Sequence, residues 1–410
     1  MIVFSWFITI IVSALVGISF IKFLTCHPLQ MNGYLLATIS LLMVDGLVVT
    51  IGLSGSHQYI AILVTTGSGL IGYFWMAKRV LSRDDPQPVP VIQREENSPG
   101  KDHMAVVYFT HGEPETYDPI GWINQFKEFD KQRIKFVPLV ARPFFLYQLR
   151  KGYLRIGKSD HRQMHHNMLR SLEKAYRDEG DLTTRFYISF LDDHPRPDAA
   201  VIQAINDGAN RIIVSEVFLT ISNHTAEGEE LIEALEVVDK YGIPVQFTGP
   251  LYNSETLKSM FVERVNANNG VADKSKVGVL LVGHGQPDEW DLQWPTETEQ
   301  EIGFREGVLK KLEQDGYLEK NLGLAWMEFK QPKPALKVAE MVQNGVKEIM
   351  YFSAAISADS MHSQYDIPVL VEKAKVPDDV RLKNLGAWNN DPIVIKAIKE
   401  KIDLKMFSPP

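Results

Sequence analysis

The pattern of hydrophobic and polar positions divides the chain into an apolar beginning and an alternating remainder. Within the first 81 residues only four side chains are charged, and three apolar runs occupy residues 2–20, 33–53 and 59–77. Each run is close to the roughly 20 residues that a helix needs to cross a bilayer. We therefore predict three transmembrane helices over residues 1–81, which make the chain a multi-pass integral membrane protein.

Positive charges at the ends of these runs predict an orientation. Lys22 follows the first run and Lys78, Arg79 and Arg83 follow the third, whereas residues 54–58 and the N-terminus carry none. Because Lys and Arg accumulate on the cytoplasmic side, we expect an anchor in the cell membrane with the rest of the chain in the cytoplasm. Asp45, inside the second run, either marks a function or only faces neighbouring helices, and the second interpretation is favoured.

Residues 82–103 are predicted to be a linker. Within this range, residues 84–102 have the sequence DDPQPVPVIQREENSPGKD, which is rich in proline and charge and has no apolar periodicity. This composition is typical of a solvated tether. A truncated protein that starts near Lys101 is therefore expected to be soluble and folded.

Charge and cysteine content exclude several classes of function. The chain carries 43 Lys and Arg against 51 Asp and Glu, a formal net charge of −8, which disfavours nucleic-acid binding because that depends on phosphate neutralisation. The single cysteine, Cys26, cannot form an intrachain disulfide, a thiolate zinc site or an iron–sulfur cluster.

Strand-like and helix-like runs alternate from residue 104 onward. The strand-like runs AVVYF, RFYISF and RIIVSEVFL form a first series, and VGVLLVG, LGLAWMEF and KEIMYFSAA form a second. Such alternation is typical of βαβ units and a parallel sheet. We predict two similar α/β lobes, residues 104–270 and 271–404, related by duplication.

Histidines occur at equivalent places in the two series. The first strand of each ends in His-Gly-x-Pro, at His111 and at His284, and a later strand is followed by His224 or His362. Ligands bind beyond the carboxyl ends of parallel strands, so we expect all four to line a crevice. A single histidine after a strand is more often an ordinary loop residue, and the spacing does not choose between the pair His111 with His224 and the pair His284 with His362.

These motifs resemble those of ferrochelatase and the related class II chelatases from about residue 105 to residue 402. VGHGQP takes the place of the family's Ser-Ala-His-Ser-Leu-Pro motif, and its His-Gly form is closer to the cobalt chelatases. YLRIGKSD is similar to the Tyr-x-x-Ile-Gly-x-x-Ser segment, and residues 187–194 are similar to the Tyr-Ile-Gly-Leu-Lys-His strand. ADSMHSQYD is similar to the Ser-Asp-His-x-Glu-x-x-Tyr-Asp motif that supplies a catalytic acid.

The resemblance implies two Rossmann-like lobes and a lyase-type metal chelatase of haem or cobalamin-type biosynthesis. Its substrates would be a divalent metal, Fe²⁺ or Co²⁺, and a tetrapyrrole of the porphyrin or sirohydrochlorin class. The implied catalytic residues are His284 and His362, and the implied metal ligands are His284, His362, Asp359 and Asp366. The implied tetrapyrrole-binding residues are Glu115, Tyr153, His194, His224 and Trp290, and the first-lobe alternative is His111 with His224. The alternative function is a non-catalytic tetrapyrrole or metal carrier or sensor at the membrane.

Two positions depart from the family pattern. His362 stands where the family has its catalytic glutamate, and Glu115 stands where a tyrosine often occurs. An ordinary histidine pKa near 6.5 predicts that His362 stops binding metal as the pH falls from about 7 to 6. Imidazole in place of a carboxylate also favours Co²⁺ and Ni²⁺.

Other charged residues are either solvated surface charges or part of the functional site. Glu297, Glu299 and Glu301 are favoured as a solvated helix face over a relay for metal entry. Solvated charges are likewise favoured over tetrapyrrole-propionate ligands for the basic residues Arg142, Arg150, Lys151 and Arg155.

Overall fold

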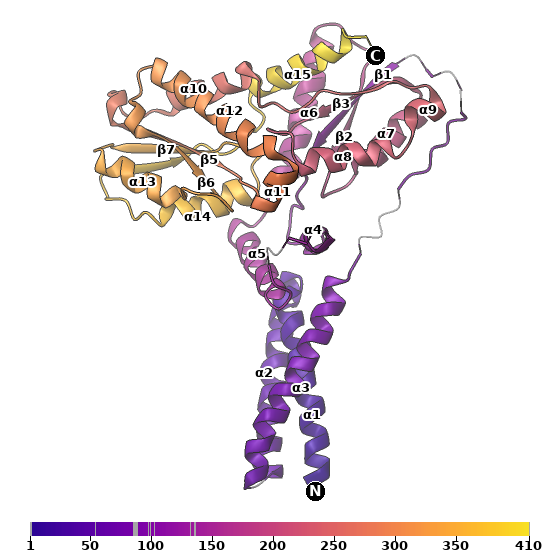
Figure 1. The fold of residues 1–410 in the computed structure, drawn as a ribbon, viewed down its shortest axis with the longest axis vertical. Helices are drawn as coiled ribbons and strands as arrows, with labels where there is room; N and C mark the ends of the chain where they lie inside the picture. Colours follow the sequence, from indigo (N-terminus) through magenta and orange to yellow (C-terminus); the bar gives the residue numbers. More distant parts are fainter. Residues whose placement is uncertain are drawn as a thin grey trace. The chain divides into compact units, whose positions relative to one another are not determined.

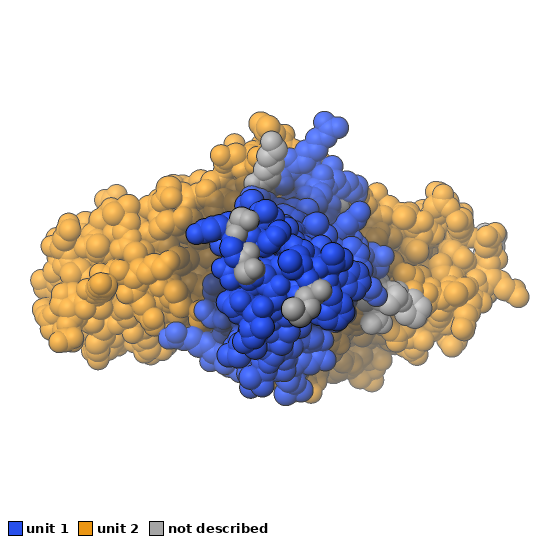
Figure 2. All heavy atoms as spheres, turned by 90° about the horizontal axis from the view of Figure 1, so that it is seen from below, with its two compact units in different colours: residues 1–87, 116–157 blue, residues 88–115, 158–410 orange. Residues whose placement is uncertain are grey.

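The chain folds into two compact units, described by a computed structural model over residues 2–53, 55–84, 89–96, 98, 100–101, 103–131, 133–134 and 137–409. The first unit comprises Met1–Gln87 and Thr116–Gly157, and the second comprises Pro88–Glu115 and Lys158–Pro410 (Figure 2). Residues 85–88, 97, 99 and 102 of the predicted linker lie outside the described residues.

Helices build the first unit as far as the structure describes it. They are α1 (Ile2–Thr25), α2 (Met31–Gly52), α3 (Ser56–Leu81), α4 (Ile120–Lys131) and α5 (Arg142–Ile156) (Figure 1). The first three are long and apolar enough to cross a membrane, with mean hydropathies of 2.3, 2.1 and 1.6 in their most apolar windows. α1 and α3 approach closely through glycine, since a Cβ on Gly17 would lie 2.1 Å from the carbonyl oxygen of Gly69.

The segment Thr116–Gly157 packs on these helices inside the first unit. Arg150 of α5 is fully buried, and its Nη1 donates to the main-chain carbonyl of Phe23 near the end of α1 at 2.7 Å. Tyr73 of α3 donates its hydroxyl to the carbonyl of Val140 at 2.7 Å. The interpretation of Arg150 as a solvated charge is therefore wrong. The segment Thr116–Gly157, which the sequence placed in the first lobe, belongs instead to the same unit as the apolar helices.

Two lobes with the same sheet topology form the second unit, which confirms the predicted fold class. The strand orders are β2-β1-β3-β4 and β6-β5-β7-β8, and all neighbouring strands are parallel. The first sheet contains β1 (His103–Thr110), β2 (Arg185–Phe190), β3 (Ala209–Glu216) and β4 (Val245–Phe247). The second contains β5 (Val277–Gly283), β6 (Leu322–Trp326), β7 (Glu348–Ser353) and β8 (Arg381–Asn384).

Helices connect successive strands within each lobe, one further helix links the two lobes, and one follows the last strand. Those of the first lobe are α6 (His161–Asp178), α7 (Pro197–Asn206), α8 (Asn223–Glu233), α9 (Val237–Tyr241) and α10 (Glu255–Asn268). Those of the second are α11 (Asp288–Gln293), α12 (Pro295–Gln314), α13 (Pro334–Gln343), α14 (Ile367–Glu372) and α15 (Pro392–Met406) (Figure 1). α10 packs on α12, and α15 returns to pack on α6 and β3. One hydrophobic core therefore contains residues of both lobes, from Val106 to Ile402.

The described part of the predicted linker beyond residue 88 lies along the first lobe. The Gln93 N–H donates to Asn206 Oδ1 at 2.7 Å, and the Lys101 N–H donates to the carbonyl of Gly208 at 2.7 Å. These hydrogen bonds dock residues 93 and 101 on the first lobe, where the composition predicts a solvated tether.

Candidate functional site

Four histidines of the second unit gather in one region. His111 follows β1, His224 lies in the first turn of α8, His284 follows β5, and His362 begins the π-helical turn His362–Asp366. The ring centroids of His111 and His224 are 4.6 Å apart, and those of His284 and His362 are 5.3 Å apart. The charge of His111 also acts on His224 and His284. The fold therefore brings together both pairs between which the spacing could not choose.

The His-Gly turns of the two lobes fix their imidazoles in the same way. Nδ1 of His111 contacts the carbonyl of Gly112 at 2.9 Å, and Nδ1 of His284 contacts the carbonyl of Gly285 at 2.7 Å. Both glycines have positive φ, 96° and 83°, and a Cβ on Gly285 would lie 2.7 Å from the carbonyl oxygen of Glu328. Because a carbonyl only accepts, Nδ1 of each ring carries a proton, and in a neutral imidazole Nε2 then keeps its lone pair for a metal ion or a proton.

The second-lobe histidines differ in charge at neutral pH. Burial, together with the charge of His362, lowers the pKa of His284 to about 3. Burial alone would also lower the pKa of His362, but a 2.8 Å contact between its Nδ1 and Asp366 Oδ2, with the charges of Glu328 and Glu113, raises it to about 9. A neutral imidazole therefore lies beside an imidazolium. The ordinary pKa that the sequence suggested for His362 is wrong because Asp366 stabilises the charged form.

Two carboxyl groups that the sequence interpretation missed face His362. Burial raises the pKa of Glu113, which follows the first His-Gly turn and accepts the Met361 N–H at 2.9 Å. Burial likewise raises the pKa of Glu328, which follows β6 and whose N–H donates to the carbonyl of His284 at 3.1 Å. Glu113 is the variable residue of the first His-Gly-x-Pro motif. Glu328 follows a strand end, so the rule about strand ends that selected the histidines applies to it as well.

The first lobe places an acid at the equivalent point. Asp192 follows β2, and its N–H donates to the carbonyl of His111 at 2.7 Å, as Glu328 does to His284. Its Oδ2 lies 3.4 Å from Nε2 of His111, whose side chain is 46% exposed. Each lobe therefore supplies a histidine, an acid on the neighbouring strand end and a second histidine.

Comparison with known proteins assigns the family. A family model described as ferrochelatase matches residues 103–406, which is well over half of the chain. This chain belongs to the ferrochelatase family. It is 23% identical over 299 residues to chloroplastic ferrochelatase-2 of Oryza sativa, a match that covers 66% of this chain and 55% of the rice protein. The chain thus spans about half the length of that relative.

Other ferrochelatase relatives are similarly distant. The ferrochelatase of Desulfotalea psychrophila is 22% identical over 256 residues, covering 61% of this chain and 78% of that protein. Among solved structures, SirB from Bacillus subtilis with Fe³⁺ has a TM-score of 0.49 and 16% identity, covering 73% of this chain and 94% of SirB.

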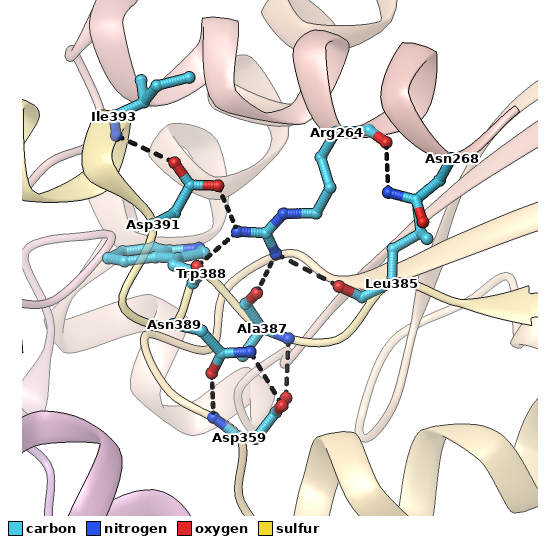
Figure 3. Close-up of polar contacts among 9 residues, drawn as sticks. All are labelled: Arg264, Asn268, Asp359, Leu385, Ala387, Trp388, Asn389, Asp391 and Ile393. Atoms are coloured by element: carbon cyan, nitrogen blue, oxygen red, sulfur yellow. Dashed lines mark hydrogen bonds and ion pairs between the residues drawn. The ribbon is translucent and has the colours of Figure 1, made fainter. Parts of the chain in front are cut away.

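Asp359, which the ferrochelatase resemblance implies as a metal ligand, bonds to its own lobe. Its Oδ1 accepts from the Ala387 N–H at 2.9 Å, and its Oδ2 accepts from the Asn389 side chain at 2.8 Å (Figure 3). The Ser363 hydroxyl also donates to Oδ1, at 2.9 Å. Arg264 of α10 donates to main-chain carbonyls of the same loop. Among the described residues no three His, Cys, Asp or Glu side chains form a group that could hold a metal ion. The metal-ligand assignments to Asp359, Asp366, His284 and His362 stay predictions.

The predicted tetrapyrrole-binding residues of this ferrochelatase-family chain lie in different surroundings. Trp290 is buried and meets His224 edge to face at 6.1 Å between ring centroids. Glu115 pairs with Lys158 at 2.9 Å, and His194 follows β2. Tyr153 belongs to α5 of the first unit, where it is buried against Tyr117. His224 and Trp290 thus lie with the histidine group, and the tetrapyrrole roles of all five residues stay predictions.

Proposed function

We propose that this chain is a membrane-anchored chelatase that inserts a divalent metal ion, Fe²⁺ or Co²⁺, into a tetrapyrrole of the porphyrin or sirohydrochlorin class. The observation that carries the proposal is the juxtaposition of neutral His284 with the His362–Asp366 pair, beside buried carboxyl groups from both lobes. Family membership supports the same chemistry. The pathway would be haem or cobalamin-type biosynthesis.

Each side chain has a distinct task in this reaction. Insertion replaces two pyrrole N–H protons by one divalent cation, so the site must deliver a metal ion and accept two protons. His284 offers the Nε2 lone pair to the metal, a borderline nitrogen donor suited to Fe²⁺ and Co²⁺. Glu113 and Glu328 accept the protons, because burial raises the pKa of each carboxyl towards neutrality. An open set of donors releases the ion, whereas a closed cage would retain it.

Turnover by the full chain in detergent tests the proposal. We expect the absorbance change of metal insertion when Fe²⁺ (without oxygen) or Co²⁺ is added with protoporphyrin or sirohydrochlorin. His27→Ala is a matched control, because His27 is exposed and lies outside the second unit. Tetrapyrrole binding without any insertion, for every metal and macrocycle tried, would support the carrier or sensor function instead.

We also propose that α1, α2 and α3 span the cell membrane and that the second unit is cytoplasmic. The support is the length and hydropathy of the helices and the positions of Lys22, Lys78 and Arg79 at their ends. A reporter that is active only outside the cytoplasm, fused after Ser82, should be silent. A strong signal from that fusion would reverse the orientation.

A further inference from the structure

A buried ion pair lies beneath the His284 turn. Glu301 and Arg305 are one helical turn apart on α12, and their side chains are 3% and 0% exposed. The sequence favoured a solvated face for Glu301, which is wrong because this side of α12 packs against the ends of the strands. Only Glu299, which points elsewhere on the same helix, is exposed as predicted.

The Glu301 carboxylate occupies the space that a side chain on residue 283 would fill. A Cβ on Gly283 would lie 2.0 Å from Glu301 Oε1, so a larger residue at the end of β5 would displace the carboxylate. The same Oε1 accepts the His284 N–H at 2.8 Å, and the Gly285 N–H also bonds to the carboxylate. One buried carboxylate therefore holds both N–H groups of the turn that carries the imidazole.

Arg305 ties this carboxylate to the sheet. Its Nη1 donates to the carbonyls of Leu281 at 3.2 Å and Ala325 at 2.8 Å, near the ends of β5 and β6. Its Nη2 lies 3.8 Å from Glu301 Oε1, and its guanidinium lies 4.0 Å from the ring centroid of Trp326. Buried ion pairs are seldom more stabilising than well-packed apolar side chains. Stability alone is therefore a weak reason for this pair.

The first lobe has a different arrangement at the corresponding place. α6 connects β1 to β2 as α12 connects β5 to β6, and it carries His161 and His165 with the same spacing of four. His165 is buried and contacts the hydroxyls of Tyr108 at 2.8 Å and Thr110 at 3.2 Å. Thr110 precedes His111 as Gly283 precedes His284. The turn beneath His111 thus meets neutral side chains where the turn beneath His284 meets a carboxylate.

We propose that Glu301 and Arg305 are positioning residues for metal insertion: they hold the His284 turn in one conformation and so make the second lobe the one that receives the metal. This inference rests on the proposed function. It requires that loss of the hydrogen bonds between Glu301 and the turn slows metal insertion more than it weakens tetrapyrrole binding. The reason is that a small misplacement of a reacting group greatly lowers the rate of a reaction.

The test compares Glu301→Leu, Glu301→Gln and the exposed-site control Glu299→Gln in the full chain, with Zn²⁺ and protoporphyrin as probes. Glu301→Leu removes the acceptor, and we expect kcat to fall by about 10²-fold with KM for protoporphyrin changed by less than about threefold. Glu301→Gln keeps an acceptor oxygen and should recover at least about tenfold over the leucine variant. Glu299→Gln should match the parent.

Binding of Co²⁺, followed by its visible absorption, gives a readout that does not require turnover. We expect the affinity for Co²⁺ to fall in Glu301→Leu and to be restored in Glu301→Gln. The inference is overturned if Glu301→Leu keeps kcat and Co²⁺ affinity, if Glu301→Gln is no better than Glu301→Leu, or if kcat, KM and melting temperature all worsen together. A parent protein that binds Co²⁺ but never turns over would instead contradict the proposed function.

Discussion

The two lobes of the second unit have the same sheet and differ in what surrounds their histidines. His111 is half-exposed and lies beside Asp192, whereas His284 is half-buried and lies beside the His362 imidazolium. Beneath the first turn lie neutral imidazoles, and beneath the second lies an ion pair. Two lobes with the same strand order therefore differ in chemistry, because the properties of each imidazole depend on side chains that the strand order leaves free to vary.

The largest difference between the lobes is the segment Thr116–Gly157, which interrupts the first lobe between β1 and α6 and packs in the first unit. A truncated protein that starts at Lys101 keeps this segment but removes its partners on α1 and α3. We expect it to aggregate unless detergent is present, contrary to the separable anchor that the linker composition suggests. Size-exclusion chromatography with and without detergent measures this.

A second truncation provides the control. Starting at Lys101 and replacing residues 116–157 by a short Gly-Ser linker leaves only the second unit. The ends of the deletion meet, since the Ser159 N–H donates to the carbonyl of Glu115 at 2.9 Å. This protein should be monodisperse without detergent. If the longer truncation is equally monodisperse, the apolar helices do not support the segment.

Replacing each of the two strand-end histidines by alanine tests whether the second lobe carries the reaction. His284→Ala should lower kcat by ~10²–10⁴-fold, the usual loss for a positioned acid–base group, and should leave the fold intact because the residue follows a strand. His111→Ala should lower it much less. Steady-state kinetics with two metals would decide, and a larger loss at His111 would move the reaction to the pair His111 with His224.

The pair His362 and Asp366 predicts a distinctive pH dependence. As a predicted metal ligand, His362 must be deprotonated to bind the ion, and its pKa of about 9 means that activity should rise as the pH increases towards 9. Asp366→Asn removes the carboxylate that raises this pKa, so the rise should move down towards the ordinary value near 6.5. The control Glu372→Gln, on exposed Glu372, should leave the profile unchanged.

Substitution of His362 itself completes this comparison. His362→Glu restores the residue type common in the family and should keep part of the activity without the rise towards pH 9, whereas His362→Ala should lose about 10²-fold. The ratio of Co²⁺ to Fe²⁺ rates should fall in the glutamate variant, since imidazole is the softer donor. An alanine variant as active as the parent would make His362 a bystander.

The smallest expected effect concerns the ends of the third strands, where Glu216 of β3 corresponds to Ser353 of β7. Burial, then the charge of Glu229, raises the pKa of Glu216 to about 8. Its stabilising contribution is therefore complete below about pH 4.5, the ordinary glutamate value, and is lost as the pH rises through 8. Glu216→Gln should be a few degrees more stable than the parent at pH 8 and not at pH 5.

Melting temperatures at both pH values check this last prediction. Glu230→Gln is the matched control, since Glu230 is exposed on α8 one residue beyond Glu229. Equal melting curves for the parent and Glu216→Gln at pH 8 would show that ionisation of Glu216 does not lower the stability of the folded state.

The sequence by itself determined the elements and their order. Three apolar runs predicted α1, α2 and α3, the alternating runs predicted both parallel sheets, and the repeated His-Gly turns predicted that His111 and His284 lie at strand ends. These properties are local, because periodicity and turn chemistry act over a few residues.

Tertiary structure decided what those residues meet. It brought Glu113 and Glu328 to His362, buried Glu301 under His284, and turned Asp359 towards its own loop. It also grouped residues 116–157 with the apolar helices. Burial and charge contacts join positions far apart in the chain, and they shift a pKa by amounts that no local pattern carries.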